Sequence, residues 1–322
     1  MTLLVVNDAE VRELLDMASC IEAMEQALGS LQRGELSMPL RFVFRPDGTS
    51  NLMGFMPAHR AGDDPIFSLK EITIAHGNSA RGLDPHQGAV ILHDGETGQL
   101  RALLNASAVT EIRTAAVSAL ATRLLARDGA RLVAVLGAGV QGRSHIEAMR
   151  AVLDEPEIRL WSRGEQRAAA LAAATGVTHA STLDEACRGA DVICACTSAR
   201  EPILALETVA PGVHINAVGS SIPTTRELTS DLVAAASLFV DRRESTLNES
   251  GDYLLAVEER AIGPDHIKAE LGELIEGVHP GRTSDDELTL FKSLGIGVED
   301  LVAADLVVAR ARERGRGTEV EF

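Results

Sequence analysis

The most constraining feature of the sequence is a glycine motif near the middle of the chain. The apolar segment 132–136 (LVAVL) leads into Gly137-Ala138-Gly139-Val140-Gln141-Gly142, and the helix-forming segment VQGRSHIEAMRAVL follows. Glycines at Gly137, Gly139 and Gly142 allow a tight turn and a close backbone approach to a pyrophosphate at the N-terminus of the helix. A glycine turn without a ligand is the alternative, but the flanking strand and helix are the context that the motif requires. The motif therefore predicts a Rossmann-type domain that binds a nicotinamide dinucleotide.

The pattern on either side of the motif predicts two domains. After residue 131, apolar strand-like segments (EIRLWSR, DVICACT, PGVHINAVG and SLFVDRR) alternate with helical ones, which indicates a doubly wound parallel sheet covered on both faces. Before it, a short strand (LLVV) precedes a helical stretch that Asn7 or Asp8 caps and that extends to Gly34. Residues 40–105 indicate antiparallel strands joined by turns, and an Ala-rich helix (SAVTEIRTAAVSALATRLLA) follows.

The fold class predicted from these patterns is α/β, with a Rossmann-type domain and an α+β domain. The final amphipathic segment, VEDLVAADLVVARARERG, lies outside the alternation, and we expect it to pack on the first domain. The predicted boundaries are 1–118 with 298–322 for the substrate-binding and dimerisation domain, and 119–297 for the dinucleotide-binding domain.

Charge and composition exclude several classes of function. A net charge of −17 disfavours binding to nucleic acid and to an anionic membrane surface. The apolar runs are too short for a membrane span, and MTLLVVNDAE has no basic leader. Cys20, Cys187, Cys194 and Cys196 show no disulfide or metal spacing, so we expect core thiols in a cytoplasmic protein.

The end of the second strand of the Rossmann segment bears on the choice of cofactor. An enzyme specific for NAD usually carries Asp or Glu about 20 residues after the glycines, where it binds the ribose 2′-hydroxyl. This chain has Trp161-Ser162-Arg163 there, and Ser and Arg suit a 2′-phosphate. The sequence therefore favours NADP(H), with NAD(H) as the alternative. If Arg163 has no functional role, it is simply an arginine that faces solvent.

Three cations in the first domain are candidates for holding a carboxylate substrate. Arg41, Lys70 and Arg113 lie in or beside apolar segments, where an unpaired charge is costly. A substrate carboxylate would compensate that charge, and so would internal salt bridges; the spacing does not separate the two. No metal-ligand pattern and no nucleophile motif accompany them, so no metal site is predicted.

Taken together, these residues resemble the ornithine cyclodeaminase/mu-crystallin family, which also includes an archaeal alanine dehydrogenase. The stretches that carry the resemblance run in order along nearly the whole chain: GFMPA (54–58), RTAAVSALAT (113–122), GAGVQG (137–142), HINAVGSSIPTTREL (214–228), NESGDYLL (248–255), AELGELIEG (269–277) and LFKSLGIGVEDLVAADL (290–306). The resemblance implies a homodimer whose first domain dimerises through sheet contacts and is completed by the C-terminal helix.

The resemblance also implies roles for individual residues. Arg41 and Lys70 hold the substrate carboxylate, Arg113 lies where substrate and cofactor meet, and Leu294 lies beside the substrate. The implied cofactor contacts, together with the motif glycines, are His86, Arg113, Thr114, Gly137, Gly139, Val140, Gln141, Gly142, Ser162, Arg163, Thr197, Val218 and Ser221.

Two departures from the family pattern separate its branches. Cyclodeaminases carry an acidic residue two positions before Met-Pro and an aspartate in the loop before P-x-x-x-E-L, whereas this chain has Gly54 and Ser221. Without both carboxylates the general acid/base pair for deamination is missing. Serine in that loop resembles the ketimine reductase branch, and Glu249 matches an acid lining its substrate pocket.

The predicted function is NAD(P)H-dependent reduction of a cyclic ketimine carboxylate, such as Δ1-pyrroline-2-carboxylate or Δ1-piperideine-2-carboxylate, to the L-amino acid. The predicted catalytic residues are Lys70, Glu249 and Ser221, with Lys70 or Glu249 supplying the proton to the imine nitrogen. Three alternatives stay open: an ornithine cyclodeaminase that recycles bound NAD, an amino-acid dehydrogenase acting on alanine or a related substrate, and a binding protein without turnover.

Overall fold

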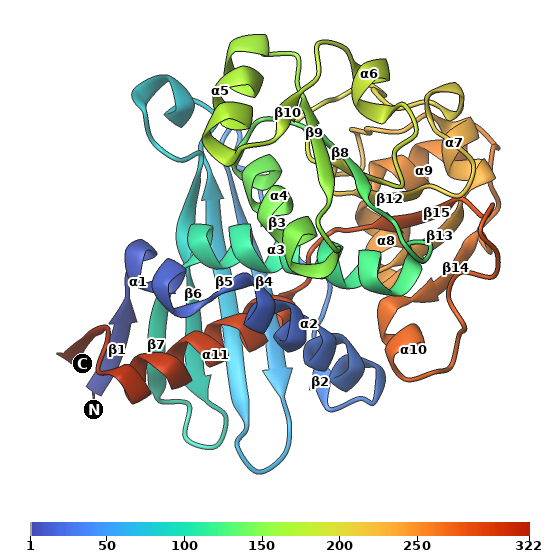
Figure 1. Ribbon diagram of the computed structural model, residues 1–322. Coiled ribbons are helices and arrows are strands. Elements are labelled where there is room, and N and C mark those ends of the chain that lie inside the picture. Colours follow the sequence, from blue (N-terminus) through green and yellow to red (C-terminus); the bar gives the residue numbers. More distant parts are fainter. Residues whose placement is uncertain (1) are drawn as a thin grey trace. The chain divides into compact units, whose positions relative to one another are not determined.

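The computed structural model describes residues 2–322, apart from the side chain of Ser79. The chain forms two compact units, Met1–Arg113 with Ile296–Phe322, and Thr114–Gly295 (Figure 1). The long helix α3 (Ala106–Leu125) belongs to both, because the division falls between Arg113 and Thr114. We describe each unit by itself.

An eight-stranded, mostly antiparallel sheet is the framework of the first unit. Its strands are β1 (Thr2–Val6), β2 (Leu36–Ser37), β3 (Phe42–Phe44), β4 (Leu52–Arg60), β5 (Ile66–Ile74), β6 (His86–Asp94), β7 (Leu100–Asn105) and β16 (Thr318–Glu321). Their order is β16-β1-β7-β6-β5-β4-β2, with β3 also paired to β4. Strands β4 to β7 form the predicted antiparallel meander, whereas β1 pairs with β7 in parallel.

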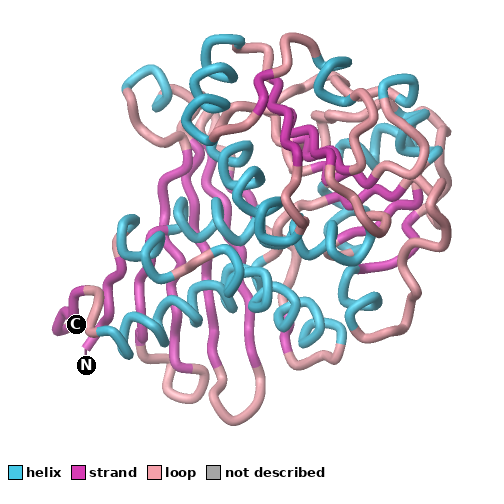
Figure 2. Tube along the Cα trace, in the orientation of Figure 1, coloured by secondary structure: helices cyan, strands magenta, loops and turns pink. Residues whose placement is uncertain are grey.

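Alternation along the central strands gives this sheet one buried and one open face. On β5, Ile66, Ser68 and Lys70 are buried, while Phe67, between the first two, is 51% exposed. The buried face is covered by α11 (Gly297–Arg314), which contacts β4, β5 and β6 and crosses the strands in Figures 1 and 2. The predicted return of the C-terminal segment onto the first domain is confirmed.

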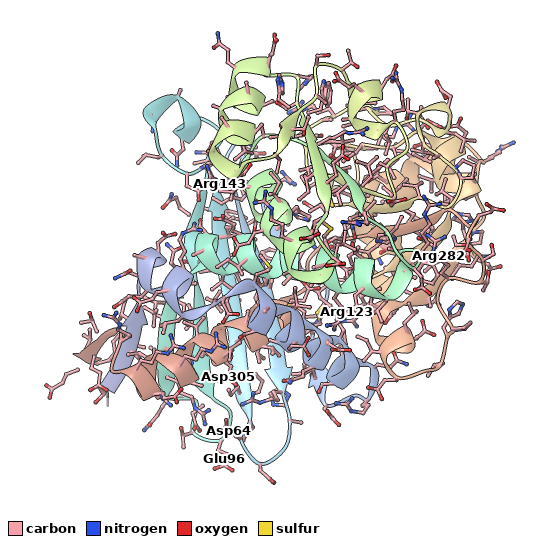
Figure 3. The ribbon with its side chains drawn as sticks, viewed as in Figure 1. Asp64, Glu96, Arg123, Arg143, Arg282 and Asp305 are labelled. Atoms are coloured by element: carbon pink, nitrogen blue, oxygen red, sulfur yellow. The ribbon has the colours of Figure 1, made fainter. Side chains whose placement is uncertain are left out.

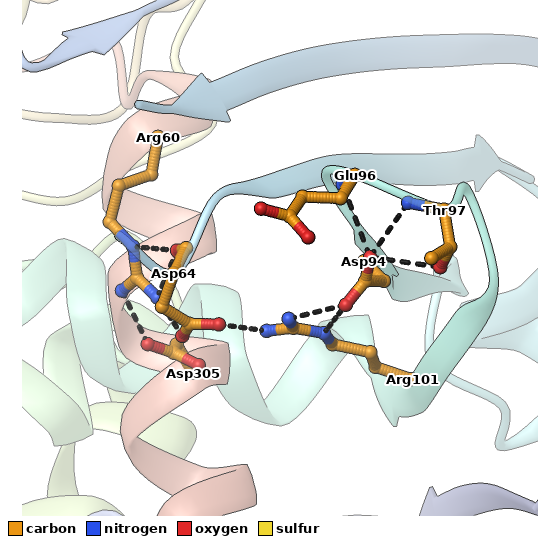
Figure 4. A network of polar contacts seen from close by, with 7 residues as sticks. All are labelled: Arg60, Asp64, Asp94, Glu96, Thr97, Arg101 and Asp305. Carbon is orange, nitrogen blue, oxygen red and sulfur yellow. Dashed lines mark hydrogen bonds and ion pairs between the residues drawn. The ribbon is translucent and has the colours of Figure 1, made fainter. Parts of the chain in front are cut away.

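Two features fix α11 on the sheet. At its N-terminal end, a Cβ at Gly297 would lie 2.9 Å from the carbonyl oxygen of Pro57, so the absence of a side chain permits the close approach to β4. At the middle of the helix, Asp305 pairs with Arg60 at 2.6 Å, and Arg60 also pairs with Asp64. Asp64 also pairs with Arg101, and Arg101 pairs with Asp94, so the network connects the β4–β5 and β6–β7 hairpins to the helix (Figure 4). Figure 3 labels Asp64, Glu96 and Asp305 in the whole chain.

The N-terminal helical stretch differs from the prediction of one continuous helix. It forms α1 (Asp8–Leu14), which Asn7 caps, and α2 (Met17–Gln32). Asp16 is extended and its side chain accepts a hydrogen bond from the amide of Ser19, so an N-cap interrupts the apolar periodicity. The predicted helical content is confirmed, but its continuity is wrong.

The second unit is built on eight parallel strands. These are β8 (Leu132–Leu136), β9 (Glu157–Trp161), β10 (Thr178–His179), β11 (Val192–Ala195), β12 (His214–Ala217), β13 (Ser237–Val240), β14 (Ile267–Glu270) and β15 (Thr289–Lys292). Their order is β10-β9-β8-β11-β12-β15-β13-β14. All four residues of β11, β12 and β15 are buried, as in a sheet covered on both faces. The predicted doubly wound sheet is confirmed.

Short helices connect these strands. They are α4 (Val140–Val152), α5 (Glu165–Thr175), α6 (Leu183–Cys187), α7 (Ser230–Ala235), α8 (Arg243–Glu249), α9 (Gly251–Glu258) and α10 (Leu271–Ile275). Arg282 fixes the end of α3 by donating from Nε to the carbonyl of Leu125 at 2.6 Å (Figure 3). Strands β14, β15 and β16 were not predicted from the sequence, because four-residue segments without long apolar runs give little periodic signal.

Candidate functional site

The glycine motif lies at the carboxyl end of β8, where the strand order of the parallel sheet reverses. Gly137 has φ 125°, and a Cβ there would lie 2.5 Å from the carbonyl oxygen of Cys196. A Cβ at Gly142 would lie 1.9 Å from the carbonyl oxygen of Gly137. Gly139 is the N-cap of α4 and makes no side-chain cap, so the first amides of the helix face the loop without a competing side chain. This arrangement suits a pyrophosphate.

The next strand end carries positive charge. Ser162 follows β9 and its hydroxyl donates to the carbonyl of Gly164 at 3.2 Å, while Arg163 is exposed. Arg167, in the first turn of α5, folds back over this turn: its guanidinium lies 3.2–3.3 Å from the Cβ position of Gly164. Two arginines therefore gather where the ribose end of a dinucleotide binds in Rossmann folds. Arg167 was not singled out in the sequence.

Two further strand ends hold the remaining cofactor candidates of the second unit. Thr197 follows β11, and Val218 and Ser221 follow β12, all at the carboxyl edge of the sheet and partly buried. The amide and the hydroxyl of Thr197 both donate to Oε1 of Glu227, each at 2.7 Å. The loops that carry these residues are therefore held together by a buried carboxylate.

Two buried histidines of the second unit are unsuited to acid–base catalysis. Burial lowers the pKa of His145 to about 4 and that of His214 to about 3. His145 shares hydrogen bonds with the carbonyl of Gln141 and the hydroxyl of Ser118, which fixes the start of α4. Both imidazoles are neutral at physiological pH and act as parts of the frame.

In the first unit, two of the predicted carboxylate-binding cations lie in one buried cluster. Nζ of Lys70 on β5 lies 2.7 Å from Oδ2 of Asp300 on α11. Arg113 on α3 donates from Nε to Oδ1 of Asp300 at 3.0 Å and from Nη1 to Glu299 at 2.9 Å. All four side chains are at most 4% exposed. Lys70 and Arg113 therefore form the internal salt bridges that were one of the two alternatives, and their binding of a substrate carboxylate stays a prediction.

The charges of this cluster act on one another. Burial lowers the pKa of Lys70 to about 8, against the opposing effect of Asp300, and the nearby charges of Arg113 and Arg41 lower it further. Burial would raise the pKa of Asp300, but Arg113 and Lys70 bring it below its usual value. Because Arg41 is close enough to affect Lys70, the three predicted cations lie in one electrostatic environment. Asp300 and Thr110, whose Oγ1 lies 3.4 Å away, occupy two of the three N–H donors of Lys70.

The other predicted residues are distributed over both units. His86 is half-exposed at the start of β6, and Thr114 is buried on α3. Glu249 ends α8 and one of its carboxylate oxygens is buried. Leu294 is buried after β15, and its amide donates to Oδ2 of Asp241 at 2.7 Å. Gly54 pairs with Ile72 on the buried side of the first sheet.

The residues that sequence reasoning missed are the carboxylates behind the cations and loops. Glu299 and Asp300 begin the C-terminal helix, and Glu227 and Asp252 lie between the loops of the second unit. A pair of acids in the first turn of this amphipathic helix was the available signal. No sequence pattern indicated their partners, which lie almost 190 positions away for Arg113 and Asp300.

The remaining expectations concern sites of other kinds. All four cysteines are free and buried, as predicted for core thiols. Within residues 2–322, no three His, Cys, Asp or Glu side chains are grouped as metal ligands would be. In the same range, no helix combines the length and the apolar character needed to cross a membrane.

Comparison with known proteins extends the resemblance over the whole chain. A family model described as the ornithine cyclodeaminase/mu-crystallin family matches residues 1–315. The ketimine reductase mu-crystallin of Mus musculus is 42% identical over 304 residues, covering 92% of this chain and 94% of that protein. Among solved structures, the Δ1-pyrroline-2-carboxylate reductase of Thermococcus litoralis, in complex with NADH and L-proline, has a TM-score of 0.94 and 32% identity, covering 99% of this chain and 100% of the other. An archaeal alanine dehydrogenase dimer with bound NAD has a TM-score of 0.94 and 30% identity, with both chains fully covered.

Proposed function

The chain belongs to the ornithine cyclodeaminase/mu-crystallin family, and on that premise we propose that it is a nicotinamide-dependent reductase of cyclic ketimine carboxylates. The substrates would be compounds such as Δ1-pyrroline-2-carboxylate or Δ1-piperideine-2-carboxylate, and the product the L-amino acid. The observation that carries the proposal is the buried Lys70–Asp300–Arg113 cluster, in a chain whose relatives include a ketimine reductase and a pyrroline-2-carboxylate reductase. Such a cluster offers two cations, Lys70 and Arg113, to a carboxylate. One of them, Lys70, also has a lowered pKa that suits proton transfer.

The first unit would bind and protonate the substrate. Asp300 pairs with both Lys70 and Arg113, so the two cations are already held together before a carboxylate arrives. Arg41 would add a further cation to the same anchor. A neutral imine is a poor hydride acceptor, and Lys70, with a pKa of about 8, can donate a proton to its nitrogen near neutral pH. Glu249 is the other candidate for this proton.

The second unit would hold the dinucleotide. Gly137, Gly139, Val140, Gln141 and Gly142 form the cradle for the pyrophosphate, and no Cβ at Gly137 or Gly142 could be accommodated without displacing backbone. When bound, the nicotinamide supplies the hydride that adds to the imine carbon. Thr197, Val218 and Ser221, at the strand ends beyond the cradle, would contact the rest of the cofactor.

We propose NADP(H) as the preferred cofactor. Ser162 and the cations Arg163 and Arg167 would bind a 2′-phosphate, and the loop after β9 contains no carboxylate before Glu165 to bind a free ribose hydroxyl. NAD(H) stays possible, because the structures of the pyrroline-2-carboxylate reductase and of the alanine dehydrogenase contain NADH and NAD.

We also propose that the protein is a homodimer formed through the open face of the first sheet. The side chains of Phe42, Phe44 and Phe67 are 62%, 53% and 51% exposed, and the ring of Phe42 lies tilted against that of Phe55 with centroids 5.9 Å apart. Several exposed aromatic side chains on one sheet indicate an interaction surface. The alanine dehydrogenase of the same fold is a dimer. The four free thiols fit a reducing, cytoplasmic setting.

An amino-acid dehydrogenase is the second candidate, because the alanine dehydrogenase matches the whole chain. A cyclodeaminase is disfavoured, since Gly54 and Ser221 replace the two carboxylates expected of that branch. A binding protein without turnover is disfavoured, because relatives that match nearly the whole chain are a ketimine reductase, a pyrroline-2-carboxylate reductase and an alanine dehydrogenase.

The test is oxidation of NADPH or NADH by the purified protein, followed by nicotinamide absorbance. With a cyclic ketimine carboxylate, rapid oxidation that prefers NADPH is expected. Oxidation that requires pyruvate and ammonia would instead establish the dehydrogenase. Release of ammonia from ornithine or lysine without net cofactor turnover would contradict the proposal and establish the lyase.

A further inference from the structure

Glu227 is a completely buried carboxylate that connects two loops of the second unit. Its Oε1 accepts hydrogen bonds from the amide and the hydroxyl of Thr197, each at 2.7 Å, and its Oε2 accepts one from the amide of Gly219 at 2.6 Å. Thr197 follows β11 and Gly219 follows β12, two neighbouring strands of the parallel sheet. One side chain therefore fixes the carboxyl ends of both strands relative to each other.

The two loops are packed so closely that no side chain fits between them. A Cβ at Gly219 would lie 1.9 Å from the carbonyl oxygen of Thr197 and 2.6 Å from Oε1 of Glu227. A displacement of one loop would therefore displace the other.

A second layer of buried charge holds Glu227 itself. The amides of Glu227 and Leu228 both donate to Oδ1 of Asp252, at 2.8 and 3.1 Å. Oδ2 of Asp252 pairs with Nζ of Lys292 at 3.1 Å, and Lys292 donates to the carbonyl of Ala217 on β12. Burial raises the pKa of Glu227, while Lys292 and the hydrogen bonds from Thr197 oppose that rise. Glu227, Asp252 and Lys292 are all buried, and burying charged groups costs free energy unless each is well compensated. These hydrogen bonds and the ion pair supply that compensation.

The donor pattern requires a carboxylate. Three donors converge on the two oxygens of Glu227, and a carboxylate can accept at both. Glutamine has nearly the same shape, but in either orientation its amide N–H₂ would face an N–H of Thr197 or Gly219.

We propose that Glu227 is a positioning residue that sets the geometry of the dinucleotide site by clamping the loops of Thr197 and Gly219. The inference rests on the proposed function, because these loops flank the carboxyl edge at which the cofactor is expected to bind. Glu227 does not touch the reacting atoms in this account, and it acts through the two loops.

The test uses Glu227→Gln in the full chain, with Glu207→Gln, an exposed glutamate of the same unit, as the matched control. In the protein without ligand, hydrogen–deuterium exchange at residues 196–199 and 217–220 should increase at least about tenfold in Glu227→Gln, as expected for loss of a charge-assisted hydrogen bond. Exchange in β8 and α4 should stay unchanged. In titrations followed by nicotinamide fluorescence, the Kd for NADPH should rise about tenfold, while the KM of the imine stays within twofold.

A second pair of variants covers the case in which Glu227→Gln does not fold. Thr197→Val removes one donor to Glu227 and keeps the side-chain shape, and Thr197→Ser keeps the hydroxyl. Faster exchange at residues 217–220 in Thr197→Val, restored in Thr197→Ser, supports the clamp. Unchanged exchange in a folded Glu227→Gln, or equal exchange in both Thr197 variants, overturns it. Failure of the wild-type protein to bind any dinucleotide would instead contradict the proposed function, and the exchange data would still report on the clamp.

Discussion

Lys70 shows how its surroundings change the chemistry of an ordinary side chain. On a solvent-exposed strand its ammonium group would stay protonated at any physiological pH. Here it is 3% exposed and faces Asp300, and burial lowers its pKa to about 8. The sequence indicated this residue because a lysine interrupts an apolar strand. It gave no indication of Asp300, which lies on the last helix.

The lowered pKa predicts the pH dependence of the reaction. In the proposed mechanism the protonated form of Lys70 binds the carboxylate and protonates the imine, so kcat/KM for the imine should fall as pH rises through about 8. Lys70→Arg keeps the charge at every accessible pH, so its residual activity should lose this alkaline decline. A rate profile measured from neutral to alkaline pH checks both statements. The same decline in Lys70→Arg would assign it to another group.

The position of a second residue, Arg163, predicts a preference for NADPH over NADH. Its exposed guanidinium follows β9, where a 2′-phosphate would lie. Arg163→Ala should raise the KM for NADPH roughly tenfold or more, because a charge-assisted hydrogen bond is lost, and leave the KM for NADH unchanged. Arg188→Ala, at another exposed arginine of this unit, is the control. An equal rise of the KM for both cofactors would show that Arg163 does not bind the 2′-phosphate.

At the scale of elements, α11 is the helix on which the first unit depends most. It supplies Glu299 and Asp300 to the buried cluster from its first turn and Asp305 to the hairpin network from its middle. The two positions differ in burial, since the side chain of Asp300 is 1% exposed and that of Asp305 is 31% exposed. The same change of charge should therefore have different consequences along one helix.

Asp300→Asn and Asp305→Asn test that difference. Removal of the buried carboxylate leaves Lys70 and Arg113 without their shared counter-charge, which should lower the free energy of unfolding by about 3 kcal/mol. The partly exposed pair of Asp305 should contribute about 0.5 kcal/mol. Urea denaturation of both variants gives the comparison. Similar losses for the two would mean that the buried cluster adds little to stability.

At the scale of the whole molecule, the proposed dimer would form through the open face of the first sheet. Its phenylalanines are costly to leave in water, and a second copy of the chain would bury them. Phe67→Lys, on the central strand β5, should convert a dimer to a monomer in size-exclusion chromatography with light scattering. Leu206→Lys, at an exposed position of the second unit, should not. A wild-type monomer would contradict the proposed dimer directly.

The sequence by itself determined the local architecture of this protein. The period of apolar residues separated the antiparallel meander from the alternating strands and helices, and the glycine motif predicted the turn after β8, because these are properties of neighbouring residues. It also selected Arg41, Lys70 and Arg113 as charges that need compensation. Caps such as Asp16 were the weak point, because Asp16 begins a new helix inside a stretch whose apolar spacing suggests a single one.

Only the tertiary structure decided which charges meet. Asp300 reaches Lys70 and Arg113 because α11 returns to the first sheet, and Glu227 reaches Thr197 and Gly219 because two strand ends lie side by side. Contacts over such separations depend on the packing of whole elements, and burial then sets the pKa of each group. The candidate residues could therefore be named from the sequence, whereas their protonation and their supports come from the fold.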